Sequence, residues 1–143
     1  MSTLHEDAFV MDGLVYHSDG DPGALRAGGI DAVNLTVAHF EADFATACRQ
    51  MADWCARLAE PDSPWRLIER AADFDTARAS GQIGLVMGWQ NSRPLDEYPE
   101  RLAFFHTIGL RIAQPTYNYR NMLGDGCLEP ANNGLSVLGR QAV

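Results

Sequence analysis

Four short apolar stretches along the chain predict four β-strands. They cover residues 9–16, 30–37, 83–88 and 110–113. The third stretch is almost continuously apolar, which is typical of a strand that is covered on both faces of a sheet. The other three are shorter or less regular, and turn residues such as glycine border them.

Amphipathic stretches between these strands predict helices. The clearest begins at the N-cap Asp43 and ends at Leu58, with apolar residues at helical spacing and Pro61 just after it. Further helices are expected at residues 21–28, 74–80, 98–108 and 135–143. The segments 61–66 and 117–133 are expected to be loops, and the second is long enough to be functional.

Strands that alternate with helices predict an α/β fold with a parallel sheet, because each helix is the crossover between two strands. The turn after the first strand, 12–14, is not the glycine-rich phosphate loop of a dinucleotide-binding fold. Four strand–helix units in 143 residues scale to eight in about 250, the usual size of a (β/α)8 barrel. We therefore expect residues 1–143 to form a single incomplete domain. It would be the N-terminal half of a TIM-like (β/α)8 barrel, within a longer protein.

The overall composition excludes several classes of partner. A formal net charge of −8 is unfavourable for binding nucleic acid, which requires a basic surface. No apolar run approaches the roughly 18 residues of a membrane span, and the first residues do not resemble a secretory signal. Three cysteines without an export signal are typical of a reduced cytoplasmic protein, so a cytoplasmic location is expected.

Polar residues follow the third and fourth predicted strands. Trp89 and Gln90 come directly after one, and Asn118 and Asn121 follow the other. Binding and catalytic groups of parallel α/β folds lie at the carboxyl ends of the strands. Trp89, Asn118 and Asn121 are therefore candidates for substrate binding, and Gln90 for a catalytic position. The alternatives are core packing for Trp89, loop capping for the two asparagines and a surface amide for Gln90.

Four segments, in order along the chain, resemble the membrane (renal) dipeptidase family of zinc peptidases. They are LRAGGIDAV at 25–33, GQIGLVMGWQN at 81–91, the stretch 101–121 around FFHTIGLR and TYN, and GLSVLG at 134–139. Each motif is short, but the four together cover nearly the whole chain in the family's order. The resemblance implies a TIM-like barrel in which two zinc ions activate a water molecule that cleaves a dipeptide.

The resemblance also locates the family's metal ligands, and here the chain differs. The histidine and aspartate that end the family's first strand correspond to Leu14 and Tyr16, and the glutamate that bridges the two zinc ions corresponds to Gln90. Two divalent cations repel each other strongly, and a bridging carboxylate offsets that repulsion. A neutral amide has the shape of a glutamate without its charge, so fewer zinc ions are expected, one or none.

His17 and Asp19 form an H-x-D sequence just beyond the first strand. Imidazole and carboxylate groups are zinc ligands, so this pair is a candidate metal site if the loop bends inward. The alternative is a polar loop that leads to the helix N-cap at Asp21.

The sequence therefore predicts a zinc-dependent hydrolase of the dipeptidase type, acting on a dipeptide or similar small amide. The alternative is a divergent relative without the two-metal centre, which binds a small molecule or performs other amide chemistry. A third interpretation is structural: an incomplete domain that is stable only in a homo-oligomer or within a longer chain.

Overall fold

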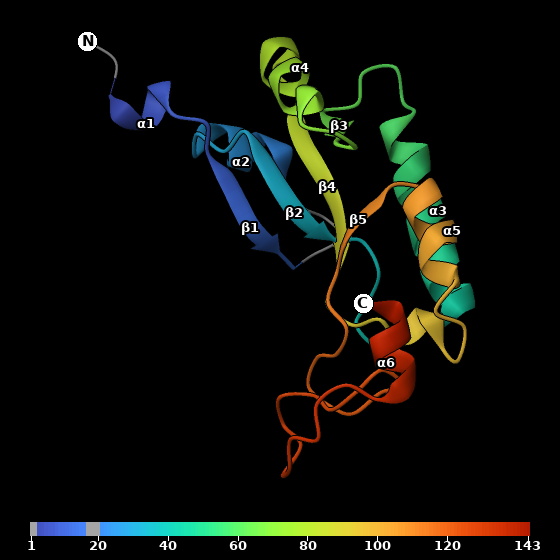
Figure 1. Ribbon diagram of the computed structural model, residues 1–143. Helices are drawn as coiled ribbons and strands as arrows, with labels where there is room; N and C mark the ends of the chain where they lie inside the picture. The colour runs from blue at the N-terminus through green and yellow to red at the C-terminus, as the bar shows by residue number, and fades with distance from the viewer. Residues whose placement is uncertain (1–2, 17–20) are drawn as a thin grey trace.

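In a computed structural model, which describes residues 3–16 and 21–143, parallel strands alternate with helices (Figure 1). The strands are β1 (Met11–Val15), β2 (Ala32–Thr36), β3 (Trp65–Leu67), β4 (Ile83–Trp89) and β5 (Leu110–Ala113). The helices are α1 (Leu4–Asp7), α2 (Pro22–Ala27), α3 (Phe44–Leu58), α4 (Ala72–Ser80), the 3-10 turn η1 (Arg93–Leu95), α5 (Arg101–Thr107) and α6 (Val137–Ala142). None of these helices is long and apolar enough to cross a membrane.

All pairings between these strands are parallel, as predicted, and β4 lies at the centre of the sheet. β2 pairs along one edge of β4, and β1 pairs with the far side of β2. The opposite edge of β4 is divided between two strands. β3 pairs with its first half, up to Leu85, and β5 pairs with its second half, from Met87 onward.

The prediction of four strands was wrong by one within the described part of the chain. β3 begins at Trp65, inside the segment 61–66 that was expected to be a loop. The strand has three residues, which is too short for a period of two to be visible in the sequence. Pro64, directly before β3, is typical of a turn and therefore favoured the prediction of a loop.

One face of the sheet is covered by α3 and α5, which lie side by side on the same side of the strands (Figure 1). Leu35 of β2 and Met87 of β4 are fully buried there, together with Met51 of α3 and Phe105 of α5. The ring of Phe105 meets that of Trp89 edge to face, with centroids 4.6 Å apart. Both rings belong to the main hydrophobic core.

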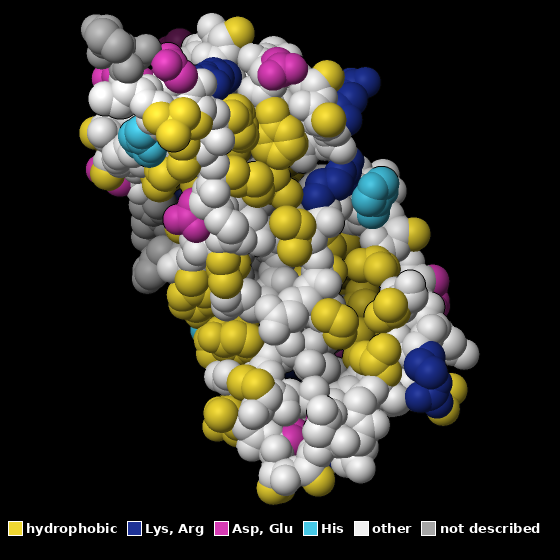
Figure 2. Space-filling view, turned by 60° about the vertical axis from the view of Figure 1, so that its left-hand side comes forward, with side chains coloured by type: hydrophobic (Ala, Val, Ile, Leu, Met, Phe, Trp, Pro, Cys, Tyr) yellow, Lys and Arg dark blue, Asp and Glu magenta, His cyan; other side chains and the backbone are white. Residues whose placement is uncertain are grey.

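The other face of the sheet carries exposed apolar side chains. Met11 and Leu14 of β1 are 39% and 47% exposed, and Ile112 of β5 is 40% exposed. Figure 2 shows that hydrophobic side chains are spread over one side of the molecule with few acidic groups among them. We call the side of the sheet opposite α3 and α5 the open face.

Side chains cap the first turns of α2, α3 and α6, and the caps Asp21 and Asp43 were expected from the sequence. Asp21, Asp43 and Ser136 each accept a hydrogen bond from a backbone amide in the first turn of α2, α3 and α6. Asp73 lies inside α4. Its carboxylate accepts from the backbone amides of Glu69 and the next residue, which precede the helix.

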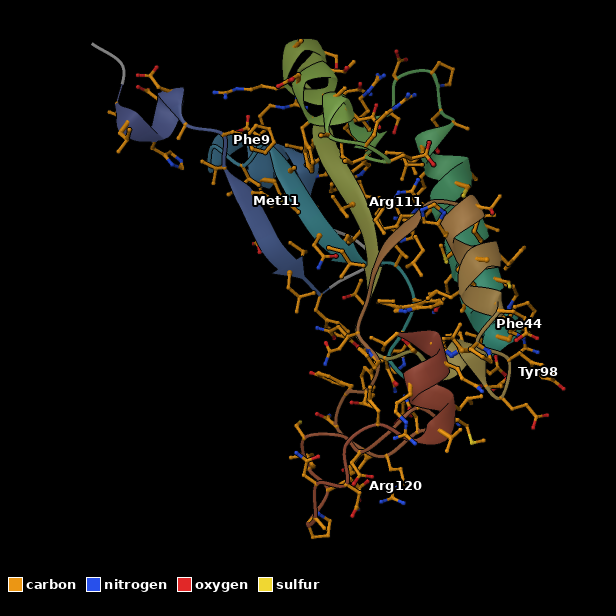
Figure 3. All side chains as sticks on the ribbon, viewed as in Figure 1. Phe9, Met11, Phe44, Tyr98, Arg111 and Arg120 are labelled. Carbon is orange, nitrogen blue, oxygen red and sulfur yellow. The ribbon has the colours of Figure 1, made fainter. Side chains whose placement is uncertain are left out.

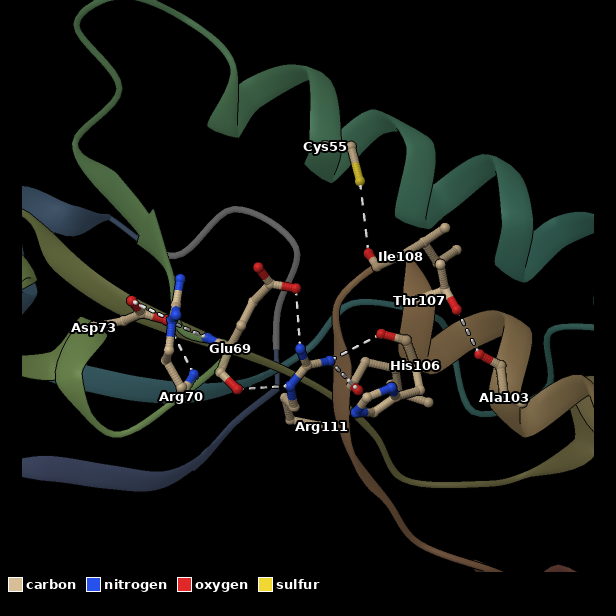
Figure 4. Close-up of polar contacts among 10 residues, drawn as sticks. Cys55, Glu69, Arg70, Asp73, Ala103, His106, Thr107, Ile108 and Arg111 are labelled. Atoms are coloured by element: carbon tan, nitrogen blue, oxygen red, sulfur yellow. Dashed lines mark hydrogen bonds and ion pairs between the residues drawn. The ribbon is translucent and has the colours of Figure 1, made fainter.

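The amino end of β5 is held by Arg111. Its guanidinium donates to the backbone carbonyls of Glu69 and His106 and forms an ion pair with the Glu69 carboxylate at 3.0 Å (Figure 4). This group therefore connects β5 to the ends of β3 and α5.

Phe9 and Met11 lie near the opposite end of the molecule from Arg120, which is in the loop after β5 (Figure 3).

Candidate functional site

Polar side chains of the open face gather at the carboxyl ends of β2 and β4. Asn34 and Thr36 are two residues apart on β2, so they point to the same face. Thr36 pairs with Gly88 in the register of the two strands, which places Gly88 and Gln90 on that face as well. Neighbouring strands are about 5 Å apart, so Thr36 is adjacent to Gly88, and Gln90 lies two residues further along β4.

Asn34 is held in one orientation by its neighbours. Its Nδ2 donates to the backbone carbonyl of Gly13 at 3.0 Å, which connects β2 to β1. Its Oδ1 lies over Gly88, where a Cβ atom would contact it directly. Glycine at position 88 therefore leaves the space that the Asn34 amide occupies.

Three oxygens of this group are buried and have no hydrogen-bond partner among residues 3–16 and 21–143: Asn34 Oδ1, Thr36 Oγ1 and Gln90 Oε1. The three side chains are 6–7% exposed. An unsatisfied buried polar group costs about 1–3 kcal/mol, so three on adjacent strand ends are unusual. We call Asn34, Thr36 and Gln90 the acceptor cluster.

A row of aromatic rings crosses the same edge of the sheet. Tyr16 follows β1, Phe40 follows β2 and Tyr117 follows β5. The ring of Phe40 lies 6.2 Å from that of Tyr16 and 5.3 Å from that of Tyr117, measured between centroids. Because β2 and β4 lie between β1 and β5 in the sheet, this aromatic row passes across the strand ends that carry the acceptor cluster.

The structure places Trp89 away from the open face. Its side chain is 2% exposed and packs against Phe105 under the helices. Trp89 therefore packs in the core, as in the alternative interpretation of this residue, and within the described part of the chain its Nε1 donor is buried without a partner. Substrate contact by Trp89 stays a prediction that this arrangement does not favour.

Asn118 and Asn121 line a cavity of about 410 Å³ beside the strand ends, together with Phe40, Asn91 and Arg93 among others. The Asn121 amide is fully used within the loop: Nδ2 donates to Asn91 Oδ1 and to a backbone carbonyl, and Oδ1 accepts from two backbone amides. Asn118 Oδ1 accepts from the Cys127 thiol at 3.6 Å and from no other group in the described ranges. Of the two, Asn118 has the greater capacity left for a ligand.

The loop that carries these asparagines is closed by Asp125. Its carboxylate accepts from the backbone and side-chain amides of Asn133 and forms an ion pair with Arg120 at 2.7 Å. The backbone amide of Asn133, aided by its side chain and by the Arg120 guanidinium, holds the pKa of Asp125 below its usual range. The loop is therefore fixed by a carboxylate that stays charged in mildly acidic solution.

The described residues do not fit a two-zinc centre. Leu14, Tyr16 and Gln90, which stand at the family's ligand positions, provide neither imidazole nor carboxylate. Within residues 3–16 and 21–143, no three histidine, cysteine, aspartate or glutamate side chains are grouped so that they could hold a metal ion. The candidate ligands His17 and Asp19 lie outside the described residues.

Sequence reasoning did not identify Asn34 and Thr36. Both lie in a stretch whose apolar residues predicted a strand, and the sequence alone did not show which face each would occupy. The signal that would have found them is two polar residues at positions i and i+2 near the end of a buried strand.

A comparison with protein-family models identifies the family of this chain. Residues 15–143 match the model of the membrane dipeptidase family, peptidase family M19. The chain belongs to the membrane dipeptidase family. The resemblance of the four sequence motifs is thus confirmed, and the family is one of hydrolytic metallodipeptidases. No curated protein matches the chain.

Solved structures confirm the predicted barrel class. An amidohydrolase from Pseudomonas aeruginosa is 28% identical, with a TM-score of 0.88 over 97% of this chain and 43% of that one. The probable dipeptidase PvdM from the same organism is 19% identical, with a TM-score of 0.80 over 97% and 44%. A metallopeptidase from Rhodobacter sphaeroides, liganded with a phosphinate mimic of the dipeptide L-Ala-D-Ala, is 16% identical, with a TM-score of 0.73 over 93% and 54%. The chain spans about half the length of these proteins.

Proposed function

We propose that this protein takes part in the hydrolysis of a dipeptide or similar small amide. The observation that carries the proposal is the match of residues 15–143 to the dipeptidase family, with polar side chains at the carboxyl edge of the sheet. The phosphinate dipeptide mimic bound by the metallopeptidase from Rhodobacter sphaeroides supports a substrate of this size.

In this proposal the described residues serve mainly to bind and orient the substrate. Gln90 replaces a charged bridging ligand by a neutral amide, which can hydrogen-bond a substrate but cannot offset the repulsion between two cations. A bound zinc ion would supply an activated water, as zinc does in hydrolases generally. Its ligands would have to include residues other than those described on the open face, and His17 and Asp19 are the candidates within this sequence.

The test is hydrolysis of L-Ala-D-Ala and of a panel of other dipeptides by the purified protein, with release of free amino acid as the measurement. The reaction is run with added zinc and with a chelator. We expect turnover that requires zinc, and Gln90→Leu should lower kcat/KM at least tenfold. Gln141→Leu, an exposed position on α6, is the matched control and should leave it unchanged. Absence of turnover on the whole panel with zinc present would refute the proposal.

A second candidate is supported by the chemistry of the ligand positions. With Leu14, Tyr16 and Gln90 in place of ligands, the protein would bind a small molecule or perform other amide chemistry without a two-metal centre. Metal analysis of the purified protein separates the two candidates. Two zinc ions per chain would exclude this second one.

A further inference from the structure

We propose that the side chain of Asn34 fills the place between the strand ends that a metal ion would need, so that no zinc ion binds there in this protein. The family's ligand positions are Leu14 and Tyr16 at the end of β1 and Gln90 at the end of β4. These two strands are separated by β2, to which Asn34 belongs. Hydrolysis with a zinc ion held by other ligands is compatible with this filled position, so the position and the proposed function can fail separately.

The register of the sheet locates the place that such an ion would take. Val15 of β1 pairs with Leu35, so Tyr16 is level with the last residue of β2. Gly88 of β4 pairs with that same residue from the other side. Neighbouring strands are about 5 Å apart, so β1 and β4 are separated by about 10 Å. Zinc lies only about 2 Å from the atoms that bind it, so an ion held from both strands would lie over the end of β2.

The Asn34 side chain already spans this width. Its Nδ2 donates to the backbone carbonyl of Gly13 on β1 at 3.0 Å. Its Oδ1 lies so close to Gly88 on β4 that a Cβ atom at that position would contact it directly. The side chain is 7% exposed. A single amide group therefore fills the space from β1 to β4, and its hydrogen bond to Gly13 holds it there.

The groups around this amide provide no zinc ligand. The acceptor cluster consists of two carboxamides and one hydroxyl, all of them neutral, whereas zinc is held by imidazole, thiolate or carboxylate groups. Asp12, the acidic residue of β1, is exposed, and its carboxylate accepts from the backbone amide of Leu14 at 3.0 Å. A divalent ion over β2 would lose water without gaining a charged ligand from the acceptor cluster, which is strongly unfavourable.

Restoring the missing ligands tests whether Asn34 blocks this place. The triple variant Leu14→His, Tyr16→Asp, Gln90→Glu supplies three ligands, the number that catalytic zinc sites use. We expect it to bind no more zinc than the unmodified protein, as measured by calorimetry and by metal analysis after dialysis. Addition of Asn34→Ala should then gain about one zinc ion per chain. Zinc should also raise the melting temperature of this quadruple variant by about 5 °C or more.

The matched control adds Asn132→Ala to the triple variant in place of Asn34→Ala. Asn132 is an exposed asparagine whose Oδ1 accepts from the backbone amide of Gly134, and its removal should gain no zinc. Circular dichroism confirms that each variant is folded. Gain of a zinc ion by the triple variant with Asn34 intact would overturn the proposal. A folded quadruple variant that gains no zinc would overturn it as well, because Asn34 would then not be the group that excludes the ion.

A second measurement keeps the native strand ends. The double variant His17→Ala, Asp19→Ala lacks the other candidate ligands, and the side-chain amide signal of Asn34 is followed by NMR while zinc is added. The signal is assigned by its absence from Asn34→Ala, and we expect zinc not to shift it. A shift that saturates with zinc would place an ion beside Asn34 and refute only this inference. Absence of dipeptide hydrolysis would refute only the proposed function.

Discussion

Replacing Gly88 by alanine tests how the acceptor cluster is built. The new Cβ would contact Asn34 Oδ1 directly and approach Ile112 Cβ at 3.4 Å. Asn34 cannot move aside freely, because it is buried and its Nδ2 donates to the carbonyl of Gly13. The Asn34 amide must therefore shift, and the contact between β1 and β2 weakens.

The size of the effect follows from three contributions. Overpacking a well-filled site costs about 1–3 kcal/mol. Loss of the hydrogen bond between Asn34 and Gly13 costs about 1 kcal/mol. The lower entropy of the unfolded chain returns about 0.4–1 kcal/mol when glycine becomes alanine. The expected net loss is about 1–3 kcal/mol in the free energy of unfolding, because the steric cost is the largest of the three.

Urea denaturation of the purified protein measures this loss. Gly13→Ala is the matched control, because no atom of the residues that the structure describes lies within 4 Å of its added Cβ, and we expect a change within about 0.5 kcal/mol. In an Asn34→Ala background the clash is absent, so Gly88→Ala should cost much less there. An equal cost with and without the Asn34 side chain would show that the reasoning is wrong.

Three further predictions concern the core, the β5 contact and the loop. Phe105→Ala should lower the free energy of unfolding by about 3–5 kcal/mol because the ring is fully buried, whereas Phe104→Ala, at a 46% exposed ring, should cost far less; similar losses would contradict this account of the core. Arg111→Lys should destabilise more than Glu69→Gln, since the guanidinium also binds backbone carbonyls and an exposed ion pair contributes only about 0.2–1 kcal/mol. Urea denaturation measures both losses, and the reverse order would contradict this account. The lowered pKa of Asp125 means that its carboxylate stabilises the loop above its unfolded pKa and that this contribution is lost as pH falls through the folded value. NMR shifts of the loop amides should follow that titration, and Asp125→Asn should abolish it.

Much of the fold could be predicted because its elements are strongly patterned. The helix from Asp43 to Leu58 has both a capping residue and helical spacing, and the structure places α3 at Phe44–Leu58. The strand at residues 83–88 is a long apolar run and became β4. In both cases the local preference for a helix or strand agrees with the burial pattern, so tertiary contacts stabilise the same structure that the local sequence favours.

The candidate site was less predictable because it depends on register between distant strands. Gln90 was identified from its family position, but its neighbours on the open face come from β2, more than fifty residues earlier in the chain. No local pattern shows that Thr36 pairs with Gly88. Trp89 is adjacent to Gln90 in sequence and points to the other face, so closeness in sequence did not mean a shared site.

Because β3 and β5 share one edge of β4, this strand tolerates a change of residue type better than a change of length. One residue added between Leu85 and Met87 would leave the pairing with β3 intact and shift the pairing with β5 by one position. Every later side chain would then turn to the opposite face, and Gln90 would point into the hydrophobic core. Insertions and deletions that preserve the acceptor cluster are therefore expected in the loops on either side of β4 and not within it.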